Sequence, residues 1–258
     1  MKLTADYHTH TVFSHGKGTI LENAIVAKEK GLLEIGISDH GFAHPVFGLT
    51  ERKLPQMRTL IDQATEQTGV KVLLGIESNI IGVDGTIDLK SRLYDKFDVL
   101  LAGIHKCVMY RPNSVFNLGA PDLFYSFVKA KKIPKSLKKT NTKTFINVIK
   151  NNPVDVITHL NFCCYAYAVE VAKVAADYGT YLELNSKKVH LTDDELYQIS
   201  KTDVKFIISS DAHSPNRVGE ISLVEETLSR VGIDKNRIMN IDGRLPEMRF
   251  KAFKEKSL

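Results

Sequence analysis

The chain alternates short apolar runs with longer stretches in which apolar residues recur at helical spacing. Most of the short runs, such as "VKVLLGIE" and "FDVLLAGIH", are nearly continuous in hydrophobicity, which is typical of strands buried on both faces of a parallel sheet. The pattern therefore predicts seven strands. They span residues 3–8, 34–40, 70–77, 97–105, 154–159, 180–185 and 205–213.

The amphipathic stretches between these runs predict helices. The first two end at glycines, which are common at helix C-termini. The predicted helices span residues 20–31, 50–69, 143–152, 166–179, 192–200 and 222–232. Strands that alternate with helices form βαβ units, so we expect a parallel sheet, and seven strands suggest a barrel. Asp84 and Gly85, between two apolar runs, predict a small hairpin within residues 79–89.

Length and composition fit one α/β domain that covers residues 1–258. A chain of 258 residues is ample for a closed hydrophobic core. The formal net charge of +5 is a mild excess. It favours anionic small molecules or weak contact with nucleic acid, but it demands neither.

Cysteine usage and the absence of targeting signals predict a cytoplasmic protein. The three cysteines are Cys107, Cys163 and Cys164, an odd count with no CxxC pair, which argues against a disulfide framework and a cysteine-based zinc site. We interpret the vicinal pair as small buried residues at a helix start, with a redox pair as the alternative. The N-terminus lacks a signal-peptide core, and no apolar stretch approaches the ~20 residues that span a bilayer, so no membrane partner is expected.

Ligand-type side chains end six of the seven predicted strands. These residues are His8, His10, His40, Glu77, His105, His159, Asp211 and His213. In a βα barrel the C-terminal ends of all strands open onto one face, so these residues should converge there. The i, i+2 pairs at His8 and His10 and at Asp211 and His213 can each offer two ligands to one cavity. Imidazoles and carboxylates without thiolates suit divalent zinc, manganese or iron.

Six ordered motifs carry a family resemblance over most of the chain. They are "DYHTHTVFSHG" (6–16), "GISDHG" (36–41), "GIES" (75–78), "AGIH" (102–105), "ITHL" (157–160) and "SSDAHSPNRVG" (209–219). The set resembles the PHP family, the polymerase and histidinol phosphatase domain of metal-dependent phosphoesterases. The resemblance implies a distorted (β/α)7 barrel that holds up to three divalent metal ions, with zinc as first choice and manganese or iron as alternatives.

The resemblance also implies a role for each ligand position. His8, His10, Glu77 and Asp211 would surround one metal. Glu77 would bridge to a second metal, which His105 and His159 would also hold. The third metal would take His15, His40 and His213, with His15 supplied by the loop after the first strand. His44 and His190 are left over and are expected to be exposed loop histidines.

Other polar residues are candidates for catalysis or substrate binding. Asp211 and Asp39 are candidate proton-transfer groups, and for Asp39 the alternative is that it orients a neighbour. Arg217 and Lys187 are candidate substrate-binding residues, and for Arg217 the alternative is a surface arginine at a helix end. An insert at about residues 107–143 includes "VKAKKIPKSLKKTNTK" (128–143), with seven lysines. Pro134 favours a loop or a broken lid there, and the alternative is a solvated connection without a role.

The predicted function is a trinuclear metal phosphatase that acts on a small phosphomonoester. One alternative is a phosphodiesterase or 3′–5′ exonuclease, but the modest charge and the lack of a separate nucleic-acid module make nucleic acid an unfavoured partner. A second is a non-catalytic domain that binds metal or stabilises a partner, against which the complete ligand set argues. A third, a metal-dependent amide hydrolase, would need a carboxylated lysine at a strand end, and no lysine is suitably placed.

Overall fold

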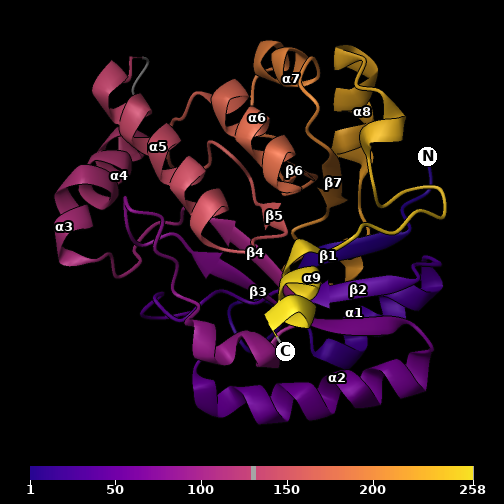
Figure 1. The fold of residues 1–258 in the computed structure, drawn as a ribbon. Helices are drawn as coiled ribbons and strands as arrows, with labels where there is room; N and C mark the ends of the chain where they lie inside the picture. The colour runs from indigo at the N-terminus through magenta and orange to yellow at the C-terminus, as the bar shows by residue number, and fades with distance from the viewer. Residues whose placement is uncertain (129–131, 258) are drawn as a thin grey trace.

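A seven-stranded parallel sheet forms the centre of the molecule (Figure 1). The computed structural model describes residues 1–128 and 132–257. Each strand pairs with the next along the chain, and a bridge between Thr9 and Ala212 brings the last strand back beside the first. The strands are β1 (Ala5–Thr9), β2 (Glu34–Ile37), β3 (Lys71–Asn79), β4 (Val99–Gly103), β5 (Val156–Ile157), β6 (Tyr181–Asn185) and β7 (Phe206–Ser209). The sheet is thus a nearly closed barrel, and the predicted distorted (β/α)7 fold is confirmed.

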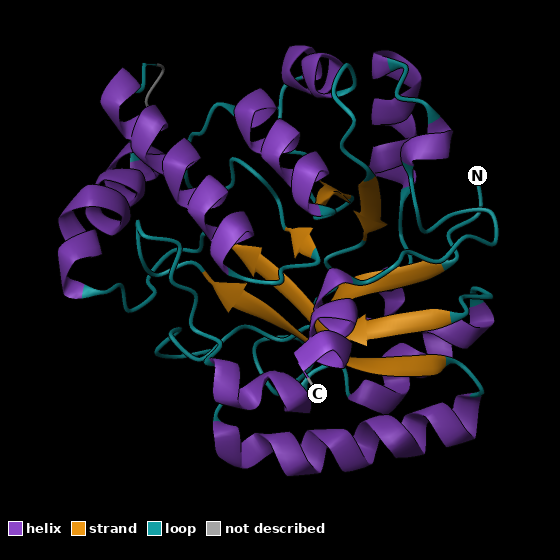
Figure 2. Cartoon of the chain, viewed as in Figure 1, coloured by secondary structure: helices purple, strands orange, loops and turns teal. Residues whose placement is uncertain are grey.

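The predicted helices surround this sheet (Figure 2). They are α1 (Ile20–Glu29), α2 (Leu54–Thr68), α5 (Lys135–Asn151), α6 (Ala168–Tyr178), α7 (Asp193–Ile199) and α8 (Ser222–Val231). α5 packs beside α6, α6 beside α7 and α7 beside α8. Local signals fix several ends: Thr19 forms a capping box at the start of α1 and Thr192 at the start of α7. None of the helices within the described residues has the length and apolar character needed to cross a bilayer.

Alternate residues of the strands line the barrel interior, and their chemistry changes along its axis. An apolar cluster fills the part nearest the strand starts; it comprises Ala5, Tyr7, Val99, Leu101, Val156, Tyr181 and Ile207. Side chains at i and i+2 of a strand share a face. The alternation that places Tyr181 in this cluster therefore carries Glu183 and Asn185 to the C-terminal mouth of the same barrel.

Two local features fit the backbone to the polar mouth. The register of β1 against β2 shifts between Asp6 and Thr9, and such irregularities re-aim the following side chains. Tyr7 therefore joins the apolar cluster, whereas His8 contacts the carboxylates at the mouth. Gly103 ends β4 where a Cβ atom would collide with the Thr158 hydroxyl and crowd the His159 ring. Only glycine allows these side chains to approach so closely.

The insert after β4 is more helical than the sequence predicted. It contains α3 (Pro112–Ser114), a π-helical turn (Val115–Gly119), α4 (Ala120–Phe127) and the first half of α5. The expected loop or broken lid is thus wrong for the lysine-rich part from Lys135 onward. Pro134 immediately precedes α5, where a missing N–H and a fixed φ are compatible with a helix start. Lys129 and Lys131 lie outside the described residues.

Two smaller elements complete the chain. The predicted hairpin within residues 79–89 is present as an antiparallel bridge between Ile80 and Ile87, with Gly85 in the left-handed region (φ 89°). A C-terminal helix that the sequence did not predict, α9 (Arg249–Ser257), covers the end of the barrel where the strands begin (Figure 1). Asp155 holds α9 there, because its carboxylate accepts hydrogen bonds from the backbone N–H groups of Phe250 and Leu100, at 2.8 and 2.9 Å.

Candidate metal centre

All nine predicted ligand residues lie together at the C-terminal mouth of the barrel. His8 lies on β1, Glu77 lies on β3, and the others follow the ends of their strands. Seven of the nine line a cavity of about 410 Å³; they are His15, His40, Glu77, His105, His159, Asp211 and His213. His8 and His10 are fully buried beside them. The convergence expected from strand topology is therefore what the structure shows.

Glu77 lies at the centre of the cluster. Its Oε1 is 2.7 Å from His159 Nε2, 2.9 Å from His105 Nε2 and 3.3 Å from His8 Nε2. Its Oε2 is 2.9 Å from His40 Nδ1 and 3.6 Å from His10 Nε2. The two oxygens of one carboxylate thus face different sets of imidazoles, as a bridging ligand requires.

Asp211 is the second carboxylate of the cluster. Its Oδ1 lies 3.2 Å from His213 Nδ1 and 3.4 Å from His10 Nε2. Asp211 has a left-handed backbone (φ 48°), and so does His159 (φ 28°). Non-glycine residues in sparsely populated regions cost about 1–3 kcal/mol each and gather at functional sites. The backbone after β5 and β7 is therefore strained where it delivers ligand-type side chains.

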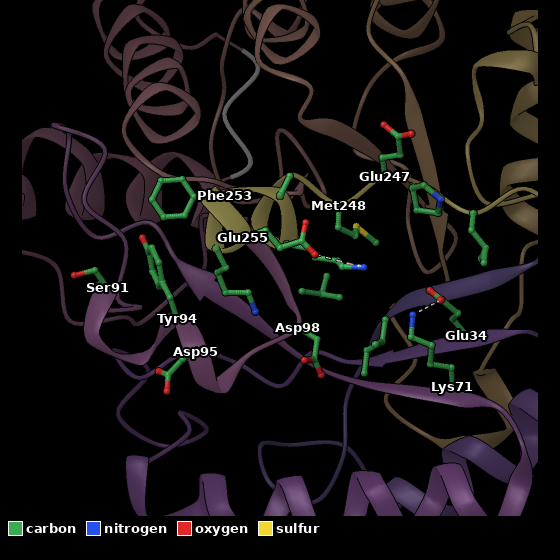
Figure 3. A pocket seen from close by; sticks show the side chains of 17 residues that line it. Glu34, Lys71, Ser91, Tyr94, Asp95, Asp98, Glu247, Met248, Phe253 and Glu255 are labelled. Atoms are coloured by element: carbon green, nitrogen blue, oxygen red, sulfur yellow. Dashed lines mark hydrogen bonds and ion pairs between the residues drawn. The ribbon is translucent and has the colours of Figure 1, made fainter. Parts of the chain in front are cut away.

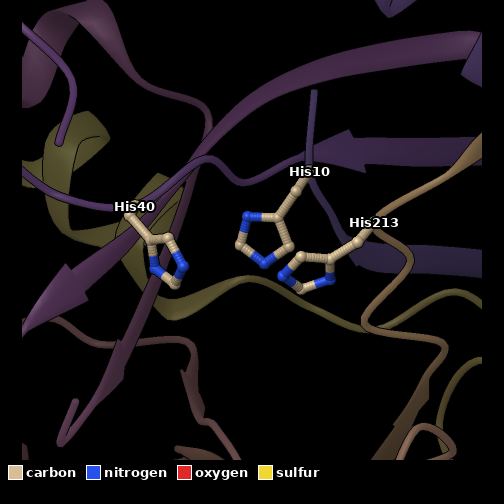
Figure 4. A group of neighbouring side chains, drawn as sticks. All are labelled: His10, His40 and His213. Atoms are coloured by element: carbon tan, nitrogen blue, oxygen red, sulfur yellow. The ribbon is translucent and has the colours of Figure 1, made fainter. Parts of the chain in front are cut away.

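Three histidines from three different loops meet beside these carboxylates (Figure 4). The ring centroid of His10 is 4.7 Å from that of His40 and 4.3 Å from that of His213. His15 stacks on His40 at 4.7 Å. Three groups have donor atoms within 4.8 Å of one another: His10, His40 and His213; His8, His10 and Asp211; and His40, Glu77 and His105.

The cluster fits metal ions better than it fits a hydrogen-bonded polar core. Among the described residues, several buried imidazole nitrogens of the cluster have no hydrogen-bond partner: Nδ1 of His10, His15, His105 and His159. His40 Nδ1 and Glu77 Oε2 lie 2.9 Å apart, but not in the geometry of a hydrogen bond. Buried polar atoms without partners are rare in native proteins and cost free energy. Imidazole nitrogens and carboxylate oxygens are donors that suit divalent zinc, manganese and iron.

The electrostatics of the cluster favour the protonation states that bind metal at four of its groups. At His8, burial would lower the pKa, but the carboxylates of Glu77, Glu183 and Asp211 raise it well above its usual value. Burial would raise the pKa of Glu77, but the surrounding imidazoles hold it well below its usual value. Burial would also raise the pKa of Asp211, but His8 and His10 hold it well below its usual value. Burial lowers the pKa of His10 well below its usual value and that of His15 to about 3. At neutral pH both carboxylates are ionised and these two imidazoles are neutral, as metal ligation requires.

Glu183 belongs to the site although the sequence analysis did not identify it. Its Oε1 lies 2.6 Å from His8 Nδ1, and its Oε2 accepts a hydrogen bond from the backbone N–H of His159 at 2.7 Å. This contact orients the His8 ring so that Nε2 faces Glu77. A carboxylate behind a ligating histidine is common in metal sites. The alternation of Tyr181, Glu183 and Asn185 along β6 was the signal that could have revealed it.

The two candidate proton-transfer residues occupy different environments. Asp211 lines the cavity. Asp39 is fully buried, and its carboxylate accepts hydrogen bonds from the Thr11 backbone at 2.8 Å, the Thr11 hydroxyl at 2.6 Å and the Ser14 hydroxyl at 2.5 Å. Asp39 thus fixes the loop that carries His15, and this placement favours the orienting alternative over proton transfer.

The two candidate substrate-binding residues also differ in placement. Lys187 lines the cavity, with its Nζ 3.0 Å from His213 Nδ1 and 3.4 Å from Asp211 Oδ1. Arg217 lies in the short 3₁₀ turn Pro215–Arg217, and its guanidinium donates to the Ser186 carbonyl at 3.4 Å. It is outside the set of residues that line the cavity. Of the two candidates, Lys187 is therefore the one that faces the cavity.

The expectation that His44 and His190 are exposed is wrong, because both are half-buried and line the cavity. His44 Nδ1 accepts a hydrogen bond from the Phe47 backbone N–H at 3.0 Å, which curls this loop over the site. The His190 ring packs 5.0 Å from Phe162. Burial lowers the pKa of His190 to about 4. These residues lie in irregular loops, where no hydrophobic period predicts which side chains turn inward.

A second cleft, of about 1140 Å³, lies at the opposite end of the barrel beneath α9 (Figure 3). Apolar side chains such as Met248 line it together with ionised residues. Its charges are largely paired: Glu34 contacts Lys71 at 2.7 Å, and Asp98, at the edge, contacts Arg58 at 2.8 Å. It contains none of the grouped ligand residues described above. The candidate functional site is therefore the smaller cavity at the mouth.

Comparisons with known proteins agree with this geometry. The chain is 30% identical to a protein of Thermoanaerobacter sp. (strain X514) named "Probable phosphatase", over 96% of this chain and 94% of that protein. It is 35% identical to a "Probable phosphatase" of Shewanella putrefaciens, over 74% of this chain and 66% of that protein. Its fold is similar to that of histidinol phosphate phosphatase from Lactococcus lactis, solved with zinc, L-histidinol and phosphate. The TM-score is 0.62 at 17% identity, with 95% of this chain and 99% of that chain covered.

That structural likeness shows a shared fold, and the family itself follows from the sequence. The PHP domain profile matches residues 6–187 of the chain, a region that contains seven of the nine predicted ligand residues. The remaining two, Asp211 and His213, follow β7 and close the same cluster. The chain belongs to the PHP domain family.

Proposed function

We propose that this chain is a metal-dependent phosphatase that hydrolyses a small phosphomonoester at a centre of three divalent metal ions. The observation that carries the proposal is that seven imidazoles and two carboxylates, one of them the central Glu77, converge at one mouth of the barrel, where seven of these nine groups line a polar cavity. Relatives named "Probable phosphatase" support the phosphatase class. The zinc in the Lactococcus structure supports zinc as first choice, with manganese or iron as alternatives.

We assign the ligands to the three metals by the family pattern, and the proximity of the donor atoms of His8, His10 and Asp211 supports the first group. His8, His10, Glu77 and Asp211 would hold the first metal. The second would share Glu77 and take His105 and His159, and the third would take His15, His40 and His213. When bound, the metals would offset the charge of the phosphoryl oxygens and lower the pKa of water at the site.

The chain's own residues supply the other requirements of the reaction. The Lys187 ammonium, beside Asp211 and His213, is placed to bind a phosphoryl oxygen. The Asp211 carboxylate lines the cavity beside Lys187 and is the candidate group for proton transfer. Phe47 and Phe162 form part of the cavity wall and limit the space for water. Asp39 acts indirectly, by fixing the loop that carries His15.

The shape and charge of the cavity favour a small monoester over the alternatives. A volume of about 410 Å³ suits a small molecule. An exonuclease would need a groove that follows a nucleic-acid chain, and a phosphodiesterase that acts on small diesters is separated from a phosphatase by assay. A non-catalytic metal-binding role leaves unexplained why Lys187 and the ligand cluster open into one cavity. We also propose that residues 1–258 form one domain, because the ligands come from both ends of the sequence.

Protein purified without chelator should contain about three metal ions per chain. Nine ligands exceed the four that one zinc usually takes, so one metal would leave buried ligands unpaired. Elemental analysis of the purified protein measures the content. A full-occupancy content of one metal or none would overturn the trinuclear assignment. Assays of 4-nitrophenyl phosphate and of bis(4-nitrophenyl) phosphate, which release the same leaving group, with zinc, manganese and iron test the function, and faster hydrolysis of the diester would contradict it.

The lysines at the start of α5 should raise the rate at which an anionic substrate reaches the cavity. α5 begins on the side of the barrel where β4 ends, so Lys132, Lys135, Lys138 and Lys139 add positive potential near the mouth. Changing all four to Gln should lower kcat/KM for a phosphomonoester by about tenfold or less at low salt. The difference should shrink as ionic strength rises above about 0.1 M.

The control for this experiment removes the same charge from the other end of the barrel. The exposed lysines Lys150, Lys205, Lys235 and Lys251 serve this purpose when changed to Gln. Their loss should have a smaller effect on kcat/KM and on its salt dependence. If both quadruple variants behave alike, or neither differs from the original protein, α5 has no steering role and is only a solvated connection.

A further inference from the structure

The candidate metal cavity carries more positive charge than its own carboxylates balance. Lys106, Lys187 and Lys188 line it, and its only acidic lining residues are Glu77 and Asp211. Both carboxylates are surrounded by imidazoles, and Lys187 contacts the Asp211 carboxylate at 3.4 Å. Within the described part of the chain, the ammonium groups of Lys106 and Lys188 have neither a hydrogen bond nor an ion pair. Bound metal ions would increase this excess.

The two unpaired lysines belong to one side of the mouth. Lys106 directly follows His105 at the end of β4, and Lys188 follows β6. Between the loops after these strands lies the ring of Phe162, whose centroid is 4.9 Å from His159 and 5.0 Å from His190. On this side of the mouth, the Phe162 ring thus extends from the predicted ligand His159 toward the rim. The ammonium groups of Lys106 and Lys188 lie at that rim.

The loop that carries Lys188 is fixed to the metal cluster. Asn185 is buried, and its Oδ1 accepts hydrogen bonds from the backbone N–H groups of Lys187 and Lys188 at 2.9 and 3.2 Å. Its Nδ2 donates to Glu183 Oε2 at 3.0 Å and to Asp211 Oδ2 at 3.2 Å. The position of Lys188 relative to the cluster is thus set before any ligand binds, which lowers the cost of ordering it.

We infer that the substrate carries a second anionic group on the part that leaves with the ester oxygen, and that Lys106 and Lys188 bind this group. This inference rests on the proposed function. The metal cluster and Lys187 take the phosphoryl group that is hydrolysed. The leaving group then extends along Phe162 toward the rim, where a carboxylate or a second phosphate meets two ammonium groups. Both anions have the same charge complementarity to the lysines, so the experiment must separate them.

Two matched substrate pairs test the inference on the metal-loaded enzyme. Glycerol 3-phosphate and 3-phosphoglycerate differ by a carboxylate, whereas fructose 6-phosphate and fructose 1,6-bisphosphate differ by a phosphate. We expect kcat/KM to favour the more charged member of at least one pair by tenfold or more at fixed ionic strength. The pair that shows the preference identifies the second anion.

Substitution of the two lysines links the preference to the rim. The double change Lys106→Gln and Lys188→Gln should reduce that preference at least fivefold. The control Lys173→Gln, on the exposed surface of α6, should leave the preference unchanged. Circular dichroism and metal content establish that the double variant is folded and loaded.

The outcomes separate this inference from the proposed function. Glycerol 3-phosphate and fructose 6-phosphate are the members of the two pairs that lack a second anion. If both are hydrolysed and neither pair shows a preference, the inference is wrong and the phosphatase assignment stands. A preference that survives in the double variant also overturns it, because the anion is then bound elsewhere. If no phosphomonoester is hydrolysed with any of the three metals, the proposed function fails and the inference fails with it.

Discussion

Changing Glu77 to Gln should lower kcat/KM for a phosphomonoester by about a thousandfold and remove most of the bound metal. Glutamine keeps the volume of the side chain but loses its negative charge and can offer only one carbonyl oxygen. Glu77 contacts His8, His105 and His159 through Oε1 and His40 through Oε2. A loss of several kcal/mol of metal-dependent stabilisation, ~4 kcal/mol, corresponds to about a thousandfold in rate.

Elemental analysis and steady-state kinetics on the same preparation measure this effect. We expect the metal content to fall by more than one ion per chain, because Glu77 is assigned to two metals. The matched control is Glu170→Gln on the exposed surface of α6, which should retain full metal content and activity. If Glu77→Gln binds metal normally and remains active, Glu77 does not bridge and the centre must be assigned again.

The ligand cluster could be predicted from the sequence because the topology of a parallel barrel brings the ends of its strands to one face. His40, Glu77 and His105 each stand at the end of an apolar run, and in a parallel barrel all such ends meet at one face. The convergence of these residues therefore follows from the topology alone, although they lie far apart in the sequence. The same logic anticipated the sheet, since continuous apolar runs separated by amphipathic helices allow few other arrangements.

The rest of the site depends on backbone geometry that no periodicity encodes. His190 and Phe162 face the cavity because irregular loops turn them inward, and His44 does so because its Nδ1 accepts backbone N–H groups of its own loop. The place of Asp39 beside His40 in the sequence allows either proton transfer or the orientation of a neighbour. The structure shows that hydrogen bonds to the loop at Thr11 occupy its carboxylate.

Helix boundaries in the insert show a further limit of pattern analysis. Lys135 to Lys143 is rich in lysine and has few apolar residues, so its helical period is weak. The segment is nevertheless helical, because Leu137 and Phe145 pack inward and buried Asn141 donates to Asp122 at 2.8 Å. Tertiary contacts of this kind override a local preference for loop. The prediction from Pro134 failed because proline breaks a helix interior but not a helix start.

Changing Glu183 to Gln should weaken metal binding by about 10- to 100-fold, although Glu183 is assigned to no metal. Its two oxygens have separate tasks: Oε1 faces His8 Nδ1, whereas Oε2 accepts hydrogen bonds from the backbone N–H of His159 and from Asn185 Nδ2. Glutamine has one acceptor oxygen for these tasks. If that oxygen serves the two fixed N–H donors, its NH₂ group faces His8 Nδ1, and the His8 proton must move to Nε2.

The displaced proton would then occupy the nitrogen that faces Glu77, which lies 3.3 Å away, and would block ligation there. A metal titration of stripped protein, followed by activity, measures the effect. We expect Glu183→Gln to need a higher metal concentration and to recover most of its kcat when metal is in excess, because the ligands themselves remain. The control Glu170→Gln, on the exposed surface of α6, should leave the titration unchanged. If Glu183→Gln titrates like the unaltered protein, Glu183 does not position His8. If excess metal restores no activity, its role is in the chemistry or the fold instead.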